Sequence, residues 1–259
     1  MSDDDASSAH HLEFVAVEVA ELAAEYVRAR CGQATAAKTK SSPTDVVTHT
    51  DMECERLIRE ELLARCPGSS IVGEEFDDDD GANNVGWIVD PIDGTVNFLY
   101  DLPVVSVSIA ATVAGDIVAG AVADVLRAET FSTARGTGAR RDGSAIGPTP
   151  CARLDEALVA TGFAYSAELR AAEADILTRL LPACRDIRCM GSAALNLCWV
   201  GCGRVDAFYE RDLKPYDYAA GALIAEESGA RVEAASESND DLTFAATPGI
   251  AGSLRALLD

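Results

Sequence analysis

The chain has 259 residues, 48% of them hydrophobic, which is enough to bury a core as one large domain or two closely joined halves. With 43 acidic and 21 basic residues, its net charge of −22 argues against nucleic acid as a main partner, because a phosphate backbone requires a basic face. No apolar run reaches the length of a membrane span, and the acidic start is unlike a signal peptide. We therefore expect a small-molecule substrate, no membrane partner and a cytoplasmic location.

Charge pattern and cysteines add to this expectation. Acidic residues are spread along the chain and lysines are few, which is typical of a protein kept soluble at very high salt. A merely acidic protein at ordinary salt is the alternative. The eight cysteines form no C-x-x-C pair and lie mostly in apolar segments, so we expect reduced, buried thiols.

The N-terminal part is predicted to be helical. Residues 1–9 have the composition of a disordered acidic tail, and apolar residues then recur at helical spacing over residues 10–31. After a loop at residues 40–45, Thr50 is expected to cap a second helix over residues 50–65.

A short strand at residues 70–72 is expected to run into Glu74 and Glu75. The acidic run at residues 77–80 lacks the alternating ligand spacing of a calcium loop. It is interpreted as a solvated hairpin tip.

The stretch 86–99, GWIVDPIDGTVNFL, is the most informative part of the sequence. Its apolar start predicts a short buried strand that is broken at Asp90. Asp90 and Asp93 lie three residues apart across a bend, which can aim both carboxylates and the carbonyl of Ile92 at one point. Hard oxygen ligands that converge in this way suit Mg²⁺. Two consecutive turns without a ligand are the alternative for such a motif in isolation.

Gly94 and Thr95 follow directly and have the pattern of a helix start. Free backbone N–H groups at a helix start can receive an anion, and Thr95 adds a hydroxyl. Metal ligands and a phosphate seat are therefore predicted within a few residues of each other.

The pattern of predicted secondary structure changes near residue 150. Before it, residues 104–114 and 116–135 alternate apolar and polar residues and predict antiparallel strands, followed by a hairpin at residues 136–143. After it, short strands alternate with helices. We expect strands at residues 158–161, 186–189, 205–209 and 242–246 and helices at residues 167–181, 192–202, 216–228 and 249–258. This places a soft boundary between a half at residues 1–150 and a fused half at residues 151–259.

Five segments, in this order and spacing, resemble the inositol monophosphatase family. They are Lys40–Thr48 with Thr50-Asp51, Gly73-Glu74-Glu75, the stretch 87–98, Gly191–Ala194 and Lys214–Gly221, which has Tyr216 where the family more often has Trp. The resemblance implies an α/β layered sandwich of αβαβα type, similar to fructose-1,6-bisphosphatase. It also implies a Mg²⁺-dependent, lithium-sensitive phosphomonoesterase that works as a homodimer.

The resemblance also implies roles for the acidic residues. Glu74, Asp90 and the Ile92 carbonyl would hold one Mg²⁺, and Asp90, Asp93 and Asp217 a second, with Glu74 reaching a third through water. Thr95 and Glu74 would orient the attacking water, while Asp51 accepts the hydrogen bond of the Thr95 hydroxyl. Amides of Gly94 and Thr95 would steady the phosphoryl group. Taken singly, Glu74 could be a surface turn residue and Asp217 could merely complement a helix dipole.

Substrate identity is less well defined by the resemblance. Asp93, Ala193 and Glu210 match positions that contact the hydroxyls of inositol, so inositol 1-phosphate is the expected substrate. Fructose 1,6-bisphosphate is the alternative, because Arg188, Arg211 or Lys214 could bind a second phosphate, although they could equally be lone surface charges. Gly191 and Ser192 are expected to line the cleft, and Lys40 to neutralise carboxylate charge. A metal-binding regulator without turnover is the remote alternative.

Overall fold

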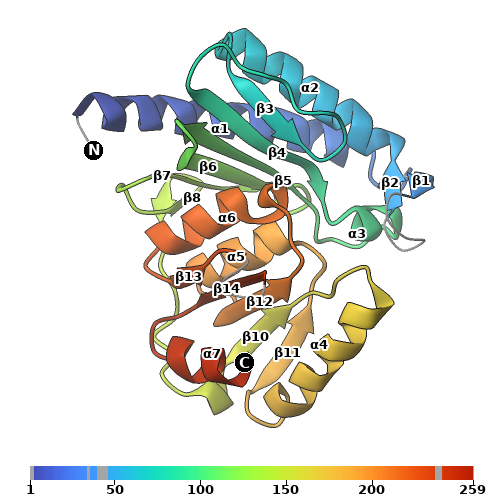
Figure 1. Ribbon diagram of the computed structural model, residues 1–259, viewed down its shortest axis with the longest axis vertical. Helices are drawn as coiled ribbons and strands as arrows, with labels where there is room; N and C mark the ends of the chain where they lie inside the picture. The colour runs from blue at the N-terminus through green and yellow to red at the C-terminus, as the bar shows by residue number, and fades with distance from the viewer. Residues whose placement is uncertain (1–2, 34–35, 40–45, 237–240, 259) are drawn as a thin grey trace.

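The computed structural model describes residues 3–33, 36–39, 46–236 and 241–258 and shows alternating layers of helices and sheets (Figure 1). The layers are helices α1 and α2, a seven-stranded sheet, helices α5 and α6, a five-stranded sheet, and helices α4 and α7. The predicted α/β layered sandwich is confirmed. Among the described helices, none combines the length and the apolar character needed to cross a membrane.

The seven-stranded sheet lies between two helical layers and has the strand order β3-β4-β5-β6-β7-β8-β9. Strands β3 and β4 are parallel, and the other neighbours are antiparallel. Its outer face is covered by α1 (Asp3–Arg28) and α2 (His49–Arg65), whose apolar residues share one core with β4 to β6. The strands are β3 (Ser70–Gly73), β4 (Val85–Asp93), β5 (Ser106–Val113), β6 (Asp116–Asp124), β7 (Glu129–Ala134), β8 (Arg140–Arg141) and β9 (Ser144–Ala145).

The five-stranded sheet has the order β11-β10-β12-β14-β13. Strand β10 pairs in parallel with β11 and β12, whereas β14 is antiparallel to β12 and β13. Helices α4 (Ala167–Leu180) and α7 (Ala251–Leu258) form the outer layer over this sheet (Figure 1). The strands are β10 (Leu158–Thr161), β11 (Asp186–Cys189), β12 (Ala207–Arg211), β13 (Arg231–Glu233) and β14 (Leu242–Ala246).

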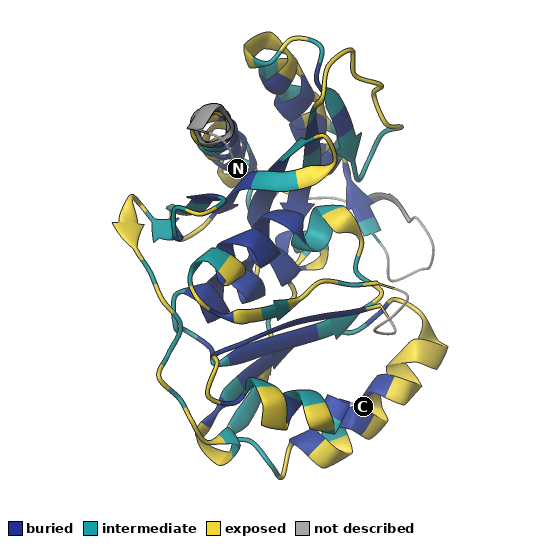
Figure 2. Cartoon of the chain, turned by 60° about the vertical axis from the view of Figure 1, so that its left-hand side comes forward, coloured by how far each residue is buried: buried dark blue, intermediate teal, exposed yellow. Residues whose placement is uncertain are grey.

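Helices α5 (Ala193–Gly201) and α6 (Pro215–Glu227) form the central layer between the two sheets (Figure 2). Every residue of α5 is buried, as expected for a helix that is covered on all sides. Helix α6 approaches β6 so closely that a Cβ at Gly120 would lie 3.1 Å from Ala220. One apolar cluster joins these helices to residues of both sheets, so residue 150 separates the strands of the two sheets while the core continues across it.

Strand β4 differs from the prediction at the central motif. It does not break at Asp90 but continues to Asp93, with a shift of register in between: Asp90 pairs with Ser108 and Asp93 with Ser106. Three steps along β4 therefore match two steps along β5, which is a β-bulge. Because Ser106 and Ser108 lie on the same face of β5, the bulge also brings Asp90 and Asp93 onto one face.

Other boundaries also differ. Helix α1 begins at Asp3, so the predicted tail at residues 1–9 is wrong from that residue on; the prediction relied on apolar periodicity, which this opening lacks. Helix α2 is capped by Thr48 and not by Thr50, because Thr48 Oγ1 accepts the amide of Asp51. The strand predicted at residues 205–209 lies at β12, and β13 was not predicted.

The remaining short elements were also missed. Strands β1 (Ala36–Thr39) and β2 (Val46–Thr48) form a small antiparallel pair, and a 3₁₀ turn, η1 (Leu154–Glu156), precedes β10. The predicted loop at residues 40–45 lies outside the described residues.

Candidate active site

Asp93 joins the end of β4 to the start of α5. Its Oδ2 accepts hydrogen bonds from Ala194 N at 2.8 Å, Ser192 Oγ at 2.5 Å and Ser106 Oγ at 3.3 Å, and its Oδ1 accepts one from Ala193 N at 3.2 Å. Burial raises the pKa of Asp93 to about 6, and these hydrogen bonds limit the rise. The N-terminal amides of α5 thus hold this carboxylate, although nearly one hundred residues separate the partners.

Asp90, Glu74 and Asp217 form the rest of an acidic group. Burial raises the pKa of Asp90 well above its usual range, and repulsion from Glu74, Asp93 and Asp217 adds to this. A hydrogen bond to Glu74 raises the pKa of Asp90 further. Burial, followed by repulsion from Glu74, raises the pKa of Asp217 in the same direction, although the amide of Lys214 donates to its Oδ2 at 2.6 Å.

A short helix, α3 (Thr95–Leu99), follows Asp93 directly. Gly94 caps it in the left-handed conformation with φ +97°, and a Cβ there would lie 2.8 Å from the Val104 carbonyl. Only glycine meets both conditions without strain. The helix start predicted at Gly94 and Thr95 is confirmed.

Thr95 is linked to Asp51 at the start of α2. Thr95 Oγ1 lies 2.9 Å from Asp51 Oδ1 and 3.0 Å from the Ile92 carbonyl, so its single proton faces two acceptors. Asp51 is fully buried and also accepts bonds from the amide and hydroxyl of Thr48. Burial raises the pKa of Asp51 to about 6, against the lowering effect of these hydrogen bonds.

A buried ion pair positions the segment that carries Glu74. Glu55, on α2, accepts hydrogen bonds from the Glu75 amide at 2.7 Å and from Arg59 Nε at 2.9 Å. Arg59 in turn reaches Asp79 at 2.7 Å. Helix α2 therefore holds two parts of the site, Thr95 through its first turn and the segment after β3 through its second and third turns.

The predicted substrate contacts divide into two groups. Ser192 and Ala193 contact Asp93, and Gly191 packs against Asn97, whose Nδ2 donates to the Met190 carbonyl at 2.7 Å. Burial raises the pKa of Glu210, and repulsion from Asp217 and Asp93 raises it further. Glu210 therefore lies near the acidic group.

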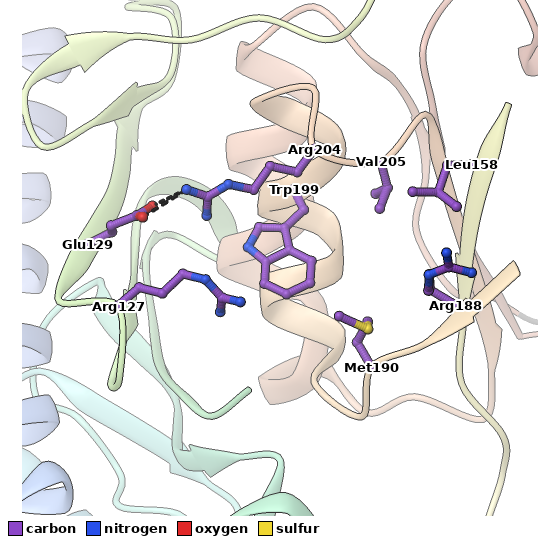
Figure 3. A pocket seen from close by; sticks show the side chains of 8 residues that line it. All are labelled: Arg127, Glu129, Leu158, Arg188, Met190, Trp199, Arg204 and Val205. Atoms are coloured by element: carbon purple, nitrogen blue, oxygen red, sulfur yellow. Dashed lines mark hydrogen bonds and ion pairs between the residues drawn. The ribbon is translucent and has the colours of Figure 1, made fainter. Parts of the chain in front are cut away.

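Arg188 and Lys40 have different outcomes. Arg188 Nη1 donates to Asp186 at 2.6 Å and to the Ile187 carbonyl, and its side chain lines a separate cavity (Figure 3). Its neighbour Cys189 lies near Glu210. Because successive strand residues point to opposite faces, the side chain of Arg188 points away from Glu210. Lys40 lies outside the described residues.

Sequence reasoning missed four contributors to this region: Thr48, Ser106, Glu55 and Arg59. Thr48 stands three residues before Asp51 and so fits the capping-box pattern, but Thr50 before Glu53 fits it equally well. Ser106 and the ion pair act across the fold and carry no local signature.

The acidic group fits Mg²⁺ by the chemistry of its donors, because this ion prefers carboxylate and carbonyl oxygens. Buried carboxylates that repel one another are unfavourable unless a cation joins them. In the described part of the chain, no three acidic, thiol or imidazole side chains are grouped so that they could hold an ion as they stand. The fit therefore rests on donor type and charge and not on a coordination shell.

Comparison with known proteins identifies the family of the chain. Over residues 8–259 the sequence matches the model of the Inositol monophosphatase family. The chain belongs to this family. It is 44% identical over 270 residues to an inositol-1-monophosphatase of Mycobacterium leprae (strain TN), with 95% of this chain and 93% of that protein covered.

Two further relatives extend the comparison. The solved structure of Mycobacterium tuberculosis SuhB has a TM-score of 0.83 and 44% identity, covering 96% of each chain. A protein of Escherichia coli (strain K12) named Nus factor SuhB is 37% identical over 193 residues, covering 74% of this chain and 72% of that protein. As a member of the inositol monophosphatase family, the chain is a phosphoric monoester hydrolase that acts on small phosphate esters.

Proposed function

We propose that this inositol monophosphatase family member hydrolyses inositol 1-phosphate to inositol and phosphate in a Mg²⁺-dependent reaction. The observation that carries the proposal is the acidic group of Asp90, Glu74, Asp93 and Asp217, directly beside the hydrogen-bonded pair of Thr95 and Asp51. Asp90 and Asp93 are buried, and Glu74 and Asp217 are partly buried. Uncompensated negative charge calls for divalent cations, and divalent cations attract a phosphate ester.

The roles follow from the donors. Glu74, Asp90 and the Ile92 carbonyl would hold one Mg²⁺, and Asp93 and Asp217 would share a second with Asp90. A third ion would be reached by Glu74 through water. When bound, Mg²⁺ neutralises the charge of the phosphate oxygens. Li⁺, similar in size but with half the charge, would inhibit by taking one of these positions.

Thr95 would orient the attacking water together with Glu74. The Thr95 hydroxyl donates toward Asp51 Oδ1 at 2.9 Å, so its oxygen lone pairs are left to accept a proton from water. Asp51 thus fixes the direction of this hydroxyl. The backbone amides of Gly94 and Thr95, at the start of α3, would steady the phosphoryl group.

A polyol is favoured as the leaving group. Glu210 lies near Asp93 and Asp217, so several carboxyl groups are available as acceptors for hydroxyl hydrogen bonds. Asp93 and the Gly191–Ala193 segment would contact the ring. Fructose 1,6-bisphosphate is less well supported, since Arg188 is engaged with Asp186 and lines the separate cavity.

The test is a substrate panel with and without Mg²⁺, in which inositol 1-phosphate, fructose 1,6-bisphosphate and 4-nitrophenyl phosphate are compared at several KCl concentrations. Thr95→Ala should lower kcat by about 10²- to 10⁴-fold with little change in KM, and Thr95→Ser should restore much of it. If calorimetry shows that Mg²⁺ binds but no ester is hydrolysed, a regulatory protein would be favoured instead. A relative with the name Nus factor SuhB is the reason to keep this alternative. A higher kcat/KM for the bisphosphate would overturn the choice of substrate.

We also propose a cytoplasmic homodimer. All eight cysteines are free thiols, which suits a reducing compartment. Tyr100 is 72% and Leu102 50% exposed, near a turn where Leu126 is exposed too, and exposed apolar surface often marks a protein contact. Sedimentation equilibrium of the wild type and of Leu102→Glu tests this; a monomeric wild type would overturn it.

A further inference from the structure

A second site is suggested by a cavity of about 330 Å³ on the side of α5 that bears Trp199 (Figure 3). Arg127, Arg188 and Arg204 line it together with Glu129, although the whole chain has only 21 basic residues against 43 acidic ones. These side chains come from the β6–β7 turn, β11 and the loop after α5, so both sheets contribute to the walls.

Two hydrogen-bond donors on residues that line this cavity are buried and lack an acceptor. Arg204 Nη2 lies 2.6 and 2.8 Å from the two carboxylate oxygens of Glu129, whereas its Nη1 is buried without a hydrogen-bond partner. The indole Nε1 of Trp199, a residue only 4% exposed, is also buried without a partner. Buried donors without acceptors are rare in folded proteins and call for an explanation.

Arg127 lies over the ring of Trp199. Its guanidinium lies 4.9 Å from the centre of the Trp199 ring, and its Nη1 donates to Asp124 at 3.1 Å. The side chain remains 37% exposed. In Figure 3 the Arg127 side chain extends toward the Trp199 indole from the β6–β7 side, whereas Arg204 extends from the loop after α5 toward Glu129. A shift of Arg127 from the ring would open the way to the two buried donors.

The other side of the cavity is apolar. Leu158, Met190 and Val205 line it next to the indole of Trp199 (Figure 3). A water molecule takes up about 30 Å³, so the volume holds about ten waters and exceeds what an inorganic ion needs.

We propose that this cavity binds a small organic oxyanion. Its carboxylate or phosphate group accepts hydrogen bonds from Arg204 Nη1 and Trp199 Nε1, with Arg127 as a further cation. Its apolar body lies against Met190, Leu158 and Val205. The site requires neither Mg²⁺ nor the acidic residues of the proposed function, so it stands or falls independently of that function.

The experiment is a titration by ¹⁹F NMR with 4-fluorobenzoate as the probe, at constant ionic strength and with EDTA. Phenylphosphonate tests whether a phosphate-like group serves as well, and sulfate tests whether an inorganic ion suffices. Benzyl alcohol tests whether the apolar body binds without a charge. We expect saturable binding of the two organic anions and much weaker binding of sulfate and benzyl alcohol.

Three variants locate the binding. Trp199→Phe keeps the ring stack but removes the N–H, and should weaken binding about tenfold to a hundredfold. Glu129→Gln removes the charge that competes for Arg204 and should strengthen binding about tenfold. Arg153→Gln removes an exposed arginine elsewhere and should change nothing. A purely structural role for Glu129 would give weaker binding instead.

Several outcomes would overturn the proposal. One is the absence of saturable binding by either organic anion, and another is equal binding by sulfate. A third is binding that Trp199→Phe and Glu129→Gln leave unchanged. If no probe binds and the same variants shift the monomer–dimer equilibrium in sedimentation, the donors serve a carboxylate of a second copy and the small-ligand site is excluded.

Discussion

The N-terminus and the C-terminal half of α5 contact opposite kinds of charge. At the N-terminus, the amides of Ala193 and Ala194 hold Asp93 among other carboxyl groups whose mutual repulsion raises their pKa values. In the C-terminal half, Trp199 lies beside Arg127 and Arg204, which pair with Asp124 and Glu129. The excess negative charge at the N-terminus of α5 favours the binding of cations. At the C-terminal half the charges are balanced, and the unpaired N–H donors favour a group that accepts hydrogen bonds. Unpaired charge and unpaired hydrogen-bond capacity therefore indicate different ligands.

The comparison can first be tested within the acidic group itself. Asp90→Asn and Asp93→Asn should both lower Mg²⁺-dependent turnover by at least about a hundredfold, because metal stabilisation of charge is worth several kcal/mol. Their metal-free stabilities should differ. Asn at position 90 imitates the protonated form that burial and repulsion favour there, so the melting temperature should not fall.

Asp93→Asn should instead lower the melting temperature in EDTA by several degrees. The amide offers one acceptor oxygen where the carboxylate offers two, so bonds to the α5 amides worth about 1.5–3 kcal/mol each are lost. Calorimetric melts next to steady-state assays check both variants. Equal melting temperatures for the two would contradict the stabilising role of the hydrogen bonds from the α5 amides to Asp93.

Loss of the Glu55–Arg59 ion pair, which positions the segment that carries Glu74, should have the next largest effect. Arg59→Gln leaves the buried Glu55 without its cation and should cost about 3–5 kcal/mol of unfolding free energy. It should also raise the Mg²⁺ concentration for half-maximal activity, because Glu74 lies in the segment after β3 that Glu55 holds through the Glu75 amide. Urea unfolding and Mg²⁺ titrations measure the two effects. Arg56→Gln, an exposed arginine on the same helix whose guanidinium lies 4.9 Å from the Phe76 ring, is the matched control.

The pH response should separate the metal-free and metal-bound states. Asp51 and Asp93 have pKa values raised from 3.8 to about 6, so the folded, metal-free protein binds more protons than the unfolded chain between these values. Their contribution to stability is present at low pH and is lost as the pH rises from about 4 to about 6. Mg²⁺ requires ionised ligands and should reverse this slope. Melting temperatures in EDTA and in Mg²⁺ test it, and Asp51→Asn should flatten the EDTA curve.

Salt should change the metal-free melting temperature and the affinity for 4-fluorobenzoate in opposite directions, and these effects should be the smallest. Between 0.1 and 1 M KCl the Debye length falls from about 10 to about 3 Å. Screening of the −22 net charge should raise the metal-free melting temperature. The same salt should weaken 4-fluorobenzoate binding several-fold, since chloride competes for the arginines. Parallel changes in both quantities would show that charge does not distinguish the two sites.

Much of the fold was predictable because periodicity and breakers act locally. The strands at residues 158–161, 186–189 and 242–246 have their predicted bounds. The bulge was not predictable, since a proline after Asp90 favours a break and only the register of β5 shows that the strand continues. Thr48 and Thr50 both precede an acidic residue by three positions, so the local pattern could not choose the cap.

For the site, the residue types were predictable and most of the contacts were not. Asp90 and Asp93 carry a compact motif, and their link to Gly94 and Thr95 is local. The hydrogen bonds from the α5 amides to Asp93 depend on packing between distant segments, and so does the hydrogen bond from the Glu75 amide to Glu55 of the Glu55–Arg59 ion pair. Arg188 shows the limit of residue type alone: its charge suggested a phosphate contact, and in the structure it pairs with Asp186 and lines a different cavity.

The bulge in β4 also limits how the chain length of the central motif can vary. If one residue between Asp90 and Asp93 were deleted, two steps along β4 would match two steps along β5, and the strand could pair regularly without the bulge. Side chains at positions 91 and 92 can be exchanged without altering this count. An engineer who transfers the motif to another sheet must therefore copy the extra residue and the serine-bearing partner strand, because the sequence letters alone do not carry the geometry.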